Sequence, residues 1–135
     1  MLKLIIGVKG TGKTKTLIAM VNEAVDNSKG SVICIEKGDK LRFDVKYQAR
    51  LINTDEYFVK DAQSLYGLVA GIFASNHDVT DLFIDSALKI CENDAAAFDK
   101  FLDEMGMLVD KLGINVVMTS SIPTDAASDT VKKYI

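Results

Sequence analysis

Eight residues near the start of the chain have the types and the spacing to hold a phosphate group. The run is Gly7-Val8-Lys9-Gly10-Thr11-Gly12-Lys13-Thr14, in which a glycine, four residues, a second glycine, a lysine and a threonine follow one another. Glycines allow successive backbone N–H groups to converge on phosphate oxygens, and a following helix presents its positive end to the same anion. In such a loop Lys13 neutralises the terminal phosphates, and the hydroxyl of Thr14 contacts a magnesium ion.

The lysines around this run give a second argument for a bound anion. Lys9, Lys13 and Lys15 crowd the start of a predicted helix, where the macrodipole disfavours further positive charge. A phosphate bound there resolves the conflict, whereas the alternative is a tight glycine turn with solvated lysines. The predicted phosphate-binding residues are Val8, Lys9, Gly10, Thr11, Gly12, Lys13, Thr14 and Lys15.

Besides the Thr14 hydroxyl, a magnesium site of this kind is expected to include an acidic residue at the end of a later apolar strand. The segment from Asp81 to Asp85 fits this pattern, although Asp81 interrupts the apolar run. We therefore predict that Asp85 and Thr14 serve the metal, and the alternative is a strand followed by an Asp turn.

The run from Gly7 to Thr14 is a Walker A motif, and through it the chain resembles the P-loop nucleoside triphosphatases. This resemblance implies ATP, or another nucleoside triphosphate, and Mg²⁺ as ligands. The ending Asp85-Ser86 resembles the RecA-like group of the additional-strand branch. More narrowly, the chain is similar to small bacterial ATP-binding proteins sometimes labelled twitching-motility ATPases. The motor proteins of that label are much larger, so no cellular process follows from the likeness.

The same resemblance implies candidates for the catalytic groups beside Lys13. Many ATPases of this branch have a glutamate directly after the metal-side acid, where this chain has Ser86. In RecA-like proteins the glutamate instead ends the second core strand, and Glu36 has that place here; the alternative is a solvated glutamate in a turn. Thr119 and Ser120 follow a later strand and resemble the sensor of the terminal phosphate, with strand-end capping as the alternative. We predict Ser120 as the sensor.

Short apolar runs alternate with amphipathic segments along the whole sequence, which is typical of a parallel sheet covered by helices on both faces. The fold class that we predict is α/β, a three-layer α/β/α sandwich with a mainly parallel sheet, and residues 1–135 are expected to form one nucleotide-binding domain. Strands are predicted at 2–6, 31–36, 82–84 and 114–118, and helices after Lys13, after Asp61, near Asp94 and from about Ala126.

The segment from Leu41 to Leu51 alternates between apolar and polar residues, which predicts a hairpin or an edge strand, with 49–53 as the strand portion. Its basic residues between Lys37 and Arg50 are able to contact a polyanion such as a nucleic acid, but a charged, solvated edge strand is the favoured interpretation. The aromatic residues nearby fit a core face better than a base-stacking surface; they are Phe43, Tyr47, Tyr57 and Phe58.

Composition excludes several classes of protein. The chain has 135 residues, 48% of them hydrophobic and 26% charged, as in ordinary globular domains, and its net charge of −3 argues against general nucleic-acid binding. It lacks the run of about 20 apolar residues that a membrane span needs, so we expect a cytoplasmic protein. Cys34 and Cys91 are predicted to be buried free thiols, and a single histidine argues against a zinc site.

Three functions remain open at this point. The first is a triphosphatase with slow ATP hydrolysis, and the second is a binding module in which the nucleotide only sets a conformation for a protein partner. A small-molecule kinase is the third, which the lack of an arginine-rich lid disfavours. An exposed sheet edge would also favour self-association as a homo-oligomer.

Overall fold

A five-stranded sheet in which every strand runs parallel to its neighbours forms the centre of the computed structural model, which describes residues 1–135. The strands are β1 (Leu2–Gly7), β2 (Ser31–Glu36), β3 (Arg50–Asn53), β4 (Val79–Ile84) and β5 (Asn115–Ser121). Their order in the sheet is β1-β5-β4-β2-β3, so β5, the last strand in sequence, lies between β1 and β4. The predicted parallel sheet is therefore confirmed.

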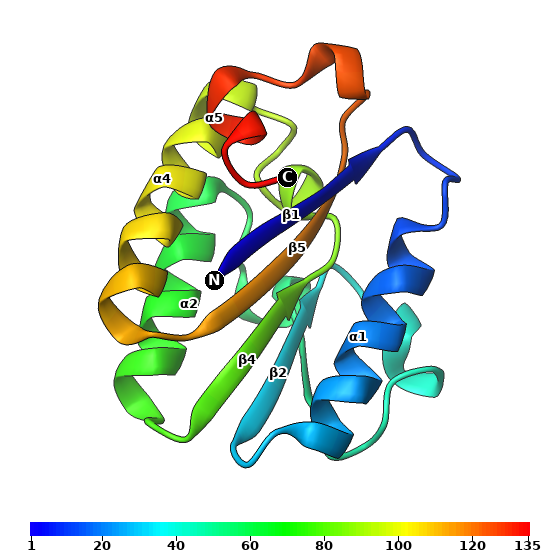
Figure 1. Ribbon diagram of the computed structural model, residues 1–135, viewed down its shortest axis with the longest axis vertical. Coiled ribbons are helices and arrows are strands. Elements are labelled where there is room, and N and C mark those ends of the chain that lie inside the picture. Colours follow the sequence, from blue (N-terminus) through cyan, green and yellow to red (C-terminus); the bar gives the residue numbers. More distant parts are fainter.

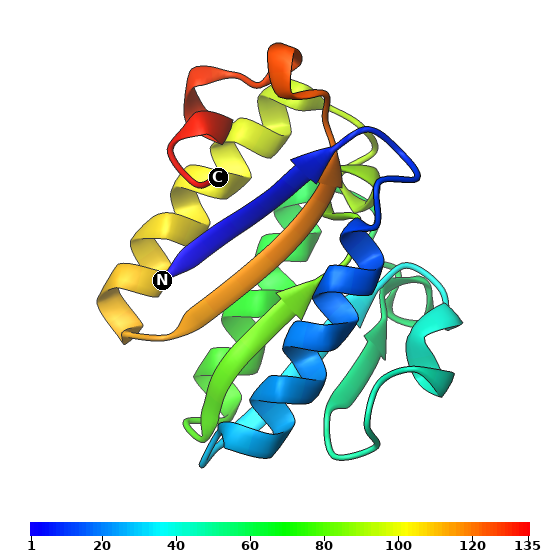
Figure 2. The same ribbon diagram turned by 45° about the vertical axis from the view of Figure 1, so that its right-hand side comes forward.

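Helices cover both faces of this sheet. They are α1 (Lys13–Asn27), α2 (Ala62–Ser75), α3 (Ala87–Ile90), α4 (Ala95–Leu112) and α5 (Asp129–Lys132), with short 3₁₀ helices η1 (Lys40–Phe43), η2 (Thr54–Tyr57) and η3 (Thr124–Ala126). Figures 1 and 2 show α1 on one face and α2 and α4 on the other. The three-layer α/β/α arrangement is confirmed.

The two long helices of the outer layer begin and end at the residues that the sequence indicates. Asp61 caps α2 by accepting a hydrogen bond from the backbone N–H of Ser64, and the two residues form a capping box. Asp94 caps α4 in the same way through the N–H of Ala97. Gly113 ends α4 in the left-handed conformation, with φ 65°, as a glycine does at a helix C-terminus.

Apolar side chains fill the space on both sides of the sheet. The larger cluster contains 23 buried residues and lies on the face covered by α2, α3 and α4, where the rings of Phe98 and Phe101 stack 6.2 Å apart. A smaller cluster of nine residues, including Leu17 and Val21, lies under α1. Strand β4 supplies Leu82 to the first cluster and Phe83 to the second, which explains its continuous apolar sequence.

The strand portion predicted at 49–53 is confirmed as an edge strand, but the alternating residues before it form neither a strand nor a hairpin. Only Arg50–Asn53 pairs with the sheet, parallel to β2 at its edge, and residues 40–43 form η1. The alternation has a different cause: Leu41, Val45 and Ala49 are buried against α1 at a spacing of four, so the segment folds over the helix as turns.

The prediction that the nearby aromatic residues form a core face is also wrong. Phe43 is 83% exposed, Tyr47 91%, Tyr57 52% and Phe58 79%. The guanidinium of Arg42 lies 4.7 Å from the centre of the Phe43 ring. Lys37, Arg42 and Lys46 form ion pairs with Asp55, Asp39 and Asp26, respectively. This pairing neutralises much of the positive charge on which contact with a polyanion would depend.

Further sequence-based expectations concern the cysteines, the sheet edges and the membrane. Cys34 and Cys91 are buried free thiols, as predicted, and burial raises the pKa of each to about 12. Strands β1 and β3 form the sheet edges, and the Leu4 N–H donates to the carbonyl of Tyr134 beside β1. Self-association through an edge stays a prediction. No helix has both the length and the apolar character to cross a bilayer.

Candidate functional site

A cavity of about 560 Å³ opens at the carboxyl ends of the strands, the end of the sheet to which the arrowheads point in Figure 1. Ligands of open parallel sheets bind at this end, because the loops after the strands surround it. The cavity is lined by Lys9, Gly10, Gly12, Lys13, Thr14, Lys15, Glu36, Lys37, Lys40, Leu41, Asp85, Ser86, Leu88, Lys89, Asn93, Thr119 and Ser121.

The loop between β1 and α1 forms one wall of this cavity. Gly10 and Gly12 have φ angles of 86° and 85°, a left-handed conformation that glycine adopts without steric cost. None of the backbone N–H groups of residues 9–15 donates a hydrogen bond within the protein. All of these residues except Lys13 are exposed, and free donors in a loop and at the start of a helix beside a cavity are the arrangement that binds an anion.

The first turn of α1 adds positive charge to these free donors. Gly12 is the N-cap and offers no side-chain acceptor, and the first turn contains no acidic residue. The ammonium of Lys13 donates to the carbonyl of Val8 at 2.9 Å, to which the hydroxyl of Thr11 also donates at 2.8 Å. These two hydrogen bonds fix the conformation of the loop, and the predicted phosphate-binding residues Val8 and Thr11 do not themselves line the cavity.

Asp85 joins the phosphate loop to the neighbouring strand. The hydroxyl of Thr14 lies 3.1 and 3.3 Å from the two carboxylate oxygens of Asp85. The hydroxyl of Thr119 donates to the same carboxylate at 2.8 Å and accepts the backbone N–H of Ser86, also at 2.8 Å. This meeting follows from the strand order, because β5 carries Thr119 between β1 and β4.

The donor set fits a magnesium ion that is held partly by phosphates. Mg²⁺ prefers oxygen ligands and is usually bound through one or two carboxylates, with waters and substrate phosphates completing its shell. Thr14 and Asp85 supply hard oxygen atoms from two elements. No group of three or more histidine, cysteine or acidic residues could by itself enclose a metal ion.

Glu36 lines the same cavity but already has backbone partners. Its two carboxylate oxygens accept the N–H groups of Lys40 and Leu41, each at 3.1 Å, and the residue is 4% exposed. Burial raises the pKa of Glu36, the two backbone hydrogen bonds oppose this shift, and the charge of Asp85 adds to it. Glu36 therefore holds η1 at the end of β2, beside the cavity.

The structure does not bring Ser120 into the cavity. Its hydroxyl donates to the carbonyl of Thr119 at 2.7 Å and accepts the N–H of Leu88 at 3.2 Å, so the side chain anchors α3 to β5. Thr119 and Ser121 line the cavity instead. Alternation along a strand places the side chains of these two residues opposite to that of Ser120.

Sequence reasoning missed the far wall of the cavity. Lys37 and Lys40 follow β2, and Lys89 and Asn93 follow β4. Their position shortly after strands that end beside the phosphate loop was the available signal, because all loops after parallel strands meet at one end of the sheet.

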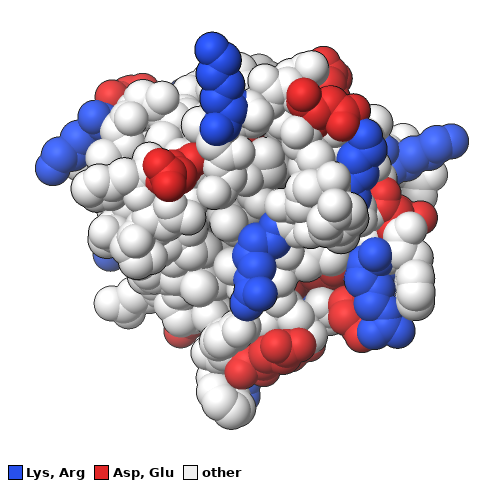
Figure 3. Space-filling model, turned by 90° about the horizontal axis from the view of Figure 1, so that it is seen from below, with Lys and Arg blue, Asp and Glu red and all other residues white.

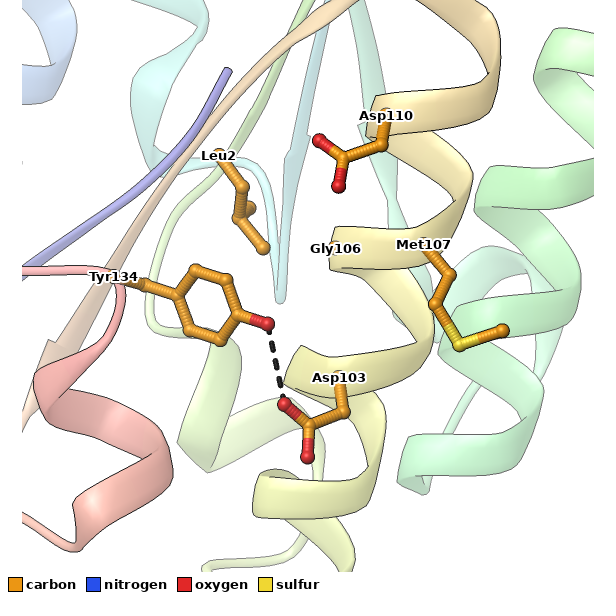
Figure 4. A pocket seen from close by; sticks show the side chains of 6 residues that line it. All are labelled: Leu2, Asp103, Gly106, Met107, Asp110 and Tyr134. Carbon is orange, nitrogen blue, oxygen red and sulfur yellow. Dashed lines mark hydrogen bonds between the residues drawn. The ribbon is translucent and has the colours of Figure 1, made fainter.

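Other surfaces of the molecule are less suited to an anion. Figure 3 shows the end where the strands begin, on which basic and acidic side chains are interspersed over a mainly uncharged surface. A second cavity, of about 440 Å³, lies between α4, β1 and the C-terminal segment. Figure 4 shows the carboxylates of Asp103 and Asp110 there, with the Tyr134 hydroxyl donating to Asp103 at 3.1 Å. Its acidic lining disfavours phosphate.

The strand order and the three layers define an α/β sandwich with an all-parallel sheet. A solved structure with this fold is that of a KaiC-like protein from the hyperthermophilic archaeon Pyrococcus horikoshii, with a TM-score of 0.70. The two chains are 14% identical, and the match covers 97% of the present chain and 65% of the archaeal one. At this identity the likeness establishes the fold alone. No family model and no curated protein matches the sequence.

Proposed function

We propose that this protein binds a nucleoside triphosphate, ATP together with Mg²⁺, in the cavity between the phosphate loop and Asp85. The observation that carries the proposal is the run of backbone N–H groups from residue 9 to residue 15 that have no acceptor within the protein. All of these residues except Thr11 line one cavity, and Lys13 adds a positive charge to them. Together they offer a polyphosphate both hydrogen bonds and opposite charge.

Thr14 and Asp85 would hold the magnesium ion beside the phosphates. Their mutual hydrogen bond places both oxygen donors at one point, and the Thr119 hydroxyl fixes the orientation of the Asp85 carboxylate. When bound, the ion supplies charge neutralisation to the terminal phosphates. Lys13 would exchange the Val8 carbonyl for a phosphate oxygen.

Slow hydrolysis is the enzymatic form of this proposal. Glu36 would orient the attacking water, because it is the carboxylate of the cavity that lies outside the Thr14–Asp85 pair. Both of its oxygens already accept backbone N–H groups, so it would act through a remaining lone pair. This engagement favours the second candidate function, a module in which the nucleotide is bound without turnover.

Calorimetric titration with ATP, with and without Mg²⁺, tests the proposal. We expect measurable affinity that increases with Mg²⁺ and falls about tenfold or more in Lys13→Ala, since a hydrogen bond to a charged group contributes about 1.5–3 kcal/mol. Lys111→Ala, an exposed lysine at the end of α4, is the matched control and should bind like the wild type. Absence of binding in the wild type, or equal affinity in Lys13→Ala, would contradict the proposal.

A further inference from the structure

The proposed nucleotide site occupies one side of its cavity and leaves a second group of basic residues on the other. Lys9, Lys13 and Lys15 belong to the phosphate loop and α1. Across the cavity, Lys40 comes from η1 and Lys89 from α3, with Asp85 and Glu36 contributed by the strands that end between the two walls. The far wall therefore carries positive charge of its own.

The carboxylates of the cavity do not neutralise this far wall. Asp85 accepts the hydroxyls of Thr14 and Thr119, and Glu36 accepts two backbone N–H groups. Neither of these acids forms a salt bridge with a lysine.

The lysines of the far wall differ in their partners. Lys37 lines the cavity but forms a salt bridge at 2.7 Å with Asp55, which does not line it. Lys40 and Lys89 have no carboxylate within 4.0 Å. Two lysines that line one cavity without a carboxylate partner favour a dianionic ligand, and a phosphate ester carries about −1.5 to −2 charges at neutral pH.

The segments that carry these lysines are anchored to the site itself. Glu36 holds the backbone N–H of Lys40, while Thr119 holds that of Ser86 at the start of α3 and Ser120 holds that of Leu88. Such fixed backbones reduce the ordering cost of binding. Asn93, in the left-handed conformation with φ 57°, adds an uncharged amide to the same wall.

We infer that Lys40 and Lys89 form a second anion subsite, which takes the phosphate group of a second ligand while the triphosphate occupies the phosphate loop. The inference rests on the proposed function and extends it from one ligand to two. The two subsites would use different positive charges. Lys9, Lys13 and Lys15, with Mg²⁺, would serve the triphosphate, and Lys40 and Lys89 would remain for the second phosphate.

The test uses the full chain saturated with Mg²⁺ and the non-hydrolysable ATP analogue AMP-PNP, so that the position of the terminal phosphate is filled. Inorganic phosphate and glycerol 3-phosphate are then titrated in separate arms at constant ionic strength, and binding is followed by calorimetry. We expect binding in at least one arm; tighter binding of glycerol 3-phosphate would identify an organic phosphate ester rather than free phosphate as the preferred ligand.

The double variant Lys40→Ala/Lys89→Ala should weaken phosphate binding about tenfold, because each partly exposed charge pair contributes up to about 1 kcal/mol. Its affinity for AMP-PNP should change less than about threefold. Lys111→Ala is the control and should leave both affinities unchanged. The inference is overturned if neither phosphate binds, or if the double variant loses AMP-PNP but not ADP affinity, since the lysines would then serve the terminal phosphate of the nucleotide.

Failure of the proposed function is distinguishable from failure of the subsite. If the wild type does not bind AMP-PNP, phosphate is titrated into Lys13→Ala without nucleotide. Phosphate binding that persists there and disappears on adding Lys40→Ala and Lys89→Ala supports the subsite alone. Loss of phosphate binding in Lys13→Ala itself overturns the subsite.

Discussion

The hydroxyl of Thr14 lies 3.1 Å from a carboxylate oxygen of Asp85, although the two residues are 71 positions apart in the sequence. Thr14 belongs to the first turn of α1, and Asp85 follows the end of β4. The contact therefore exists only because the parallel sheet brings the ends of β1 and β4 to one side. It couples a hydroxyl at the phosphate loop to a fixed carboxylate.

This pair predicts that magnesium dependence is lost before nucleotide binding. Thr14→Ala and Asp85→Asn each remove one proposed metal contact but leave the free N–H groups of residues 9–15 in place. We expect either variant to retain most of its ATP affinity without Mg²⁺ and to lose about tenfold of its affinity in Mg²⁺. Titrations in Mg²⁺ and in EDTA measure the two terms separately. A uniform loss under both conditions would show that the pair maintains the loop rather than the metal.

Glu36 predicts a pH dependence of stability. Its pKa is raised in the folded protein, chiefly by burial, so the folded state binds a proton more tightly than the unfolded state does. The contribution of Glu36 to stability is therefore largest below the ordinary pKa of 4.5 and is lost as the pH rises through the raised value. Urea unfolding measured from pH 4 to pH 8 should show this decrease, and Glu36→Gln should reduce it. An unchanged slope in Glu36→Gln would assign the pH dependence to other groups.

Turnover tests the other role proposed for Glu36. If this carboxylate orients water, Glu36→Gln should abolish ATP hydrolysis while ATP affinity is retained. Release of phosphate by the wild type and the variant is compared at saturating ATP and Mg²⁺. Equal rates would remove Glu36 from catalysis, and a wild type that binds ATP without turnover would favour the nucleotide-gated module.

The fold and the phosphate loop were predictable because their signals are local. Apolar runs identify strands buried on both faces, and the glycine pattern requires only a neighbouring strand and helix. Only part of the arrangement around Asp85 was predictable. Asp85 could be identified by its place after a strand, but its hydrogen bond from Thr119 depends on which strand lies between β1 and β4. Sequence order does not determine that arrangement.

The segment from 41 to 51 shows a different limit. Alternation suggests a strand, yet Leu41, Val45 and Ala49 recur every four residues and are buried against α1. The same residues therefore fit both a two-residue and a four-residue period, and tertiary packing decides which structure forms. The same ambiguity assigned Phe43 and Tyr47 to a core face, although both are exposed. Lys89 was missed because its role depends on α3, a helix of four residues without a periodic signal.

Because the aromatic residues between Phe43 and Phe58 are exposed, we expect them to contribute little to stability. Tyr47 is 91% exposed, so Tyr47→Ser should change the free energy of unfolding by no more than about 0.5 kcal/mol. Phe101 is 1% exposed, and Phe101→Ala should cost about 3–5 kcal/mol. Denaturant unfolding of the two variants makes the comparison. A cost above 2 kcal/mol for Tyr47→Ser would restore the core interpretation.

The glycines of the chain predict substitutions of opposite sign. Gly12 has φ 85°, and a Cβ added there meets no atom within 4 Å, so Gly12→Ala should cost about 1–2 kcal/mol through backbone conformation alone. Gly67 lies inside α2 with equally open space, and Gly67→Ala should stabilise by about 0.5–1 kcal/mol. Unfolding midpoints test both. Equal effects at the two positions would show that the left-handed conformation of Gly12 is not required.

Two substitutions of Thr119 separate the role of its hydroxyl from the role of its methyl group. The side chain is 1% exposed, and its oxygen both donates to Asp85 and accepts from the Ser86 N–H. Thr119→Val keeps the shape but leaves a partly buried N–H and one carboxylate oxygen without this partner, which should cost about 1–3 kcal/mol of stability. Thr119→Ser keeps the oxygen and loses only a methyl group, so it should cost about 1 kcal/mol.

The Mg²⁺ dependence of ATP binding then distinguishes a role of Thr119 in orienting Asp85 from a role in packing alone. If Thr119 orients Asp85, then Thr119→Val, but not Thr119→Ser, should also weaken the Mg²⁺-dependent part of ATP binding. Equal Mg²⁺ dependence in both variants would leave Thr119 a purely structural residue.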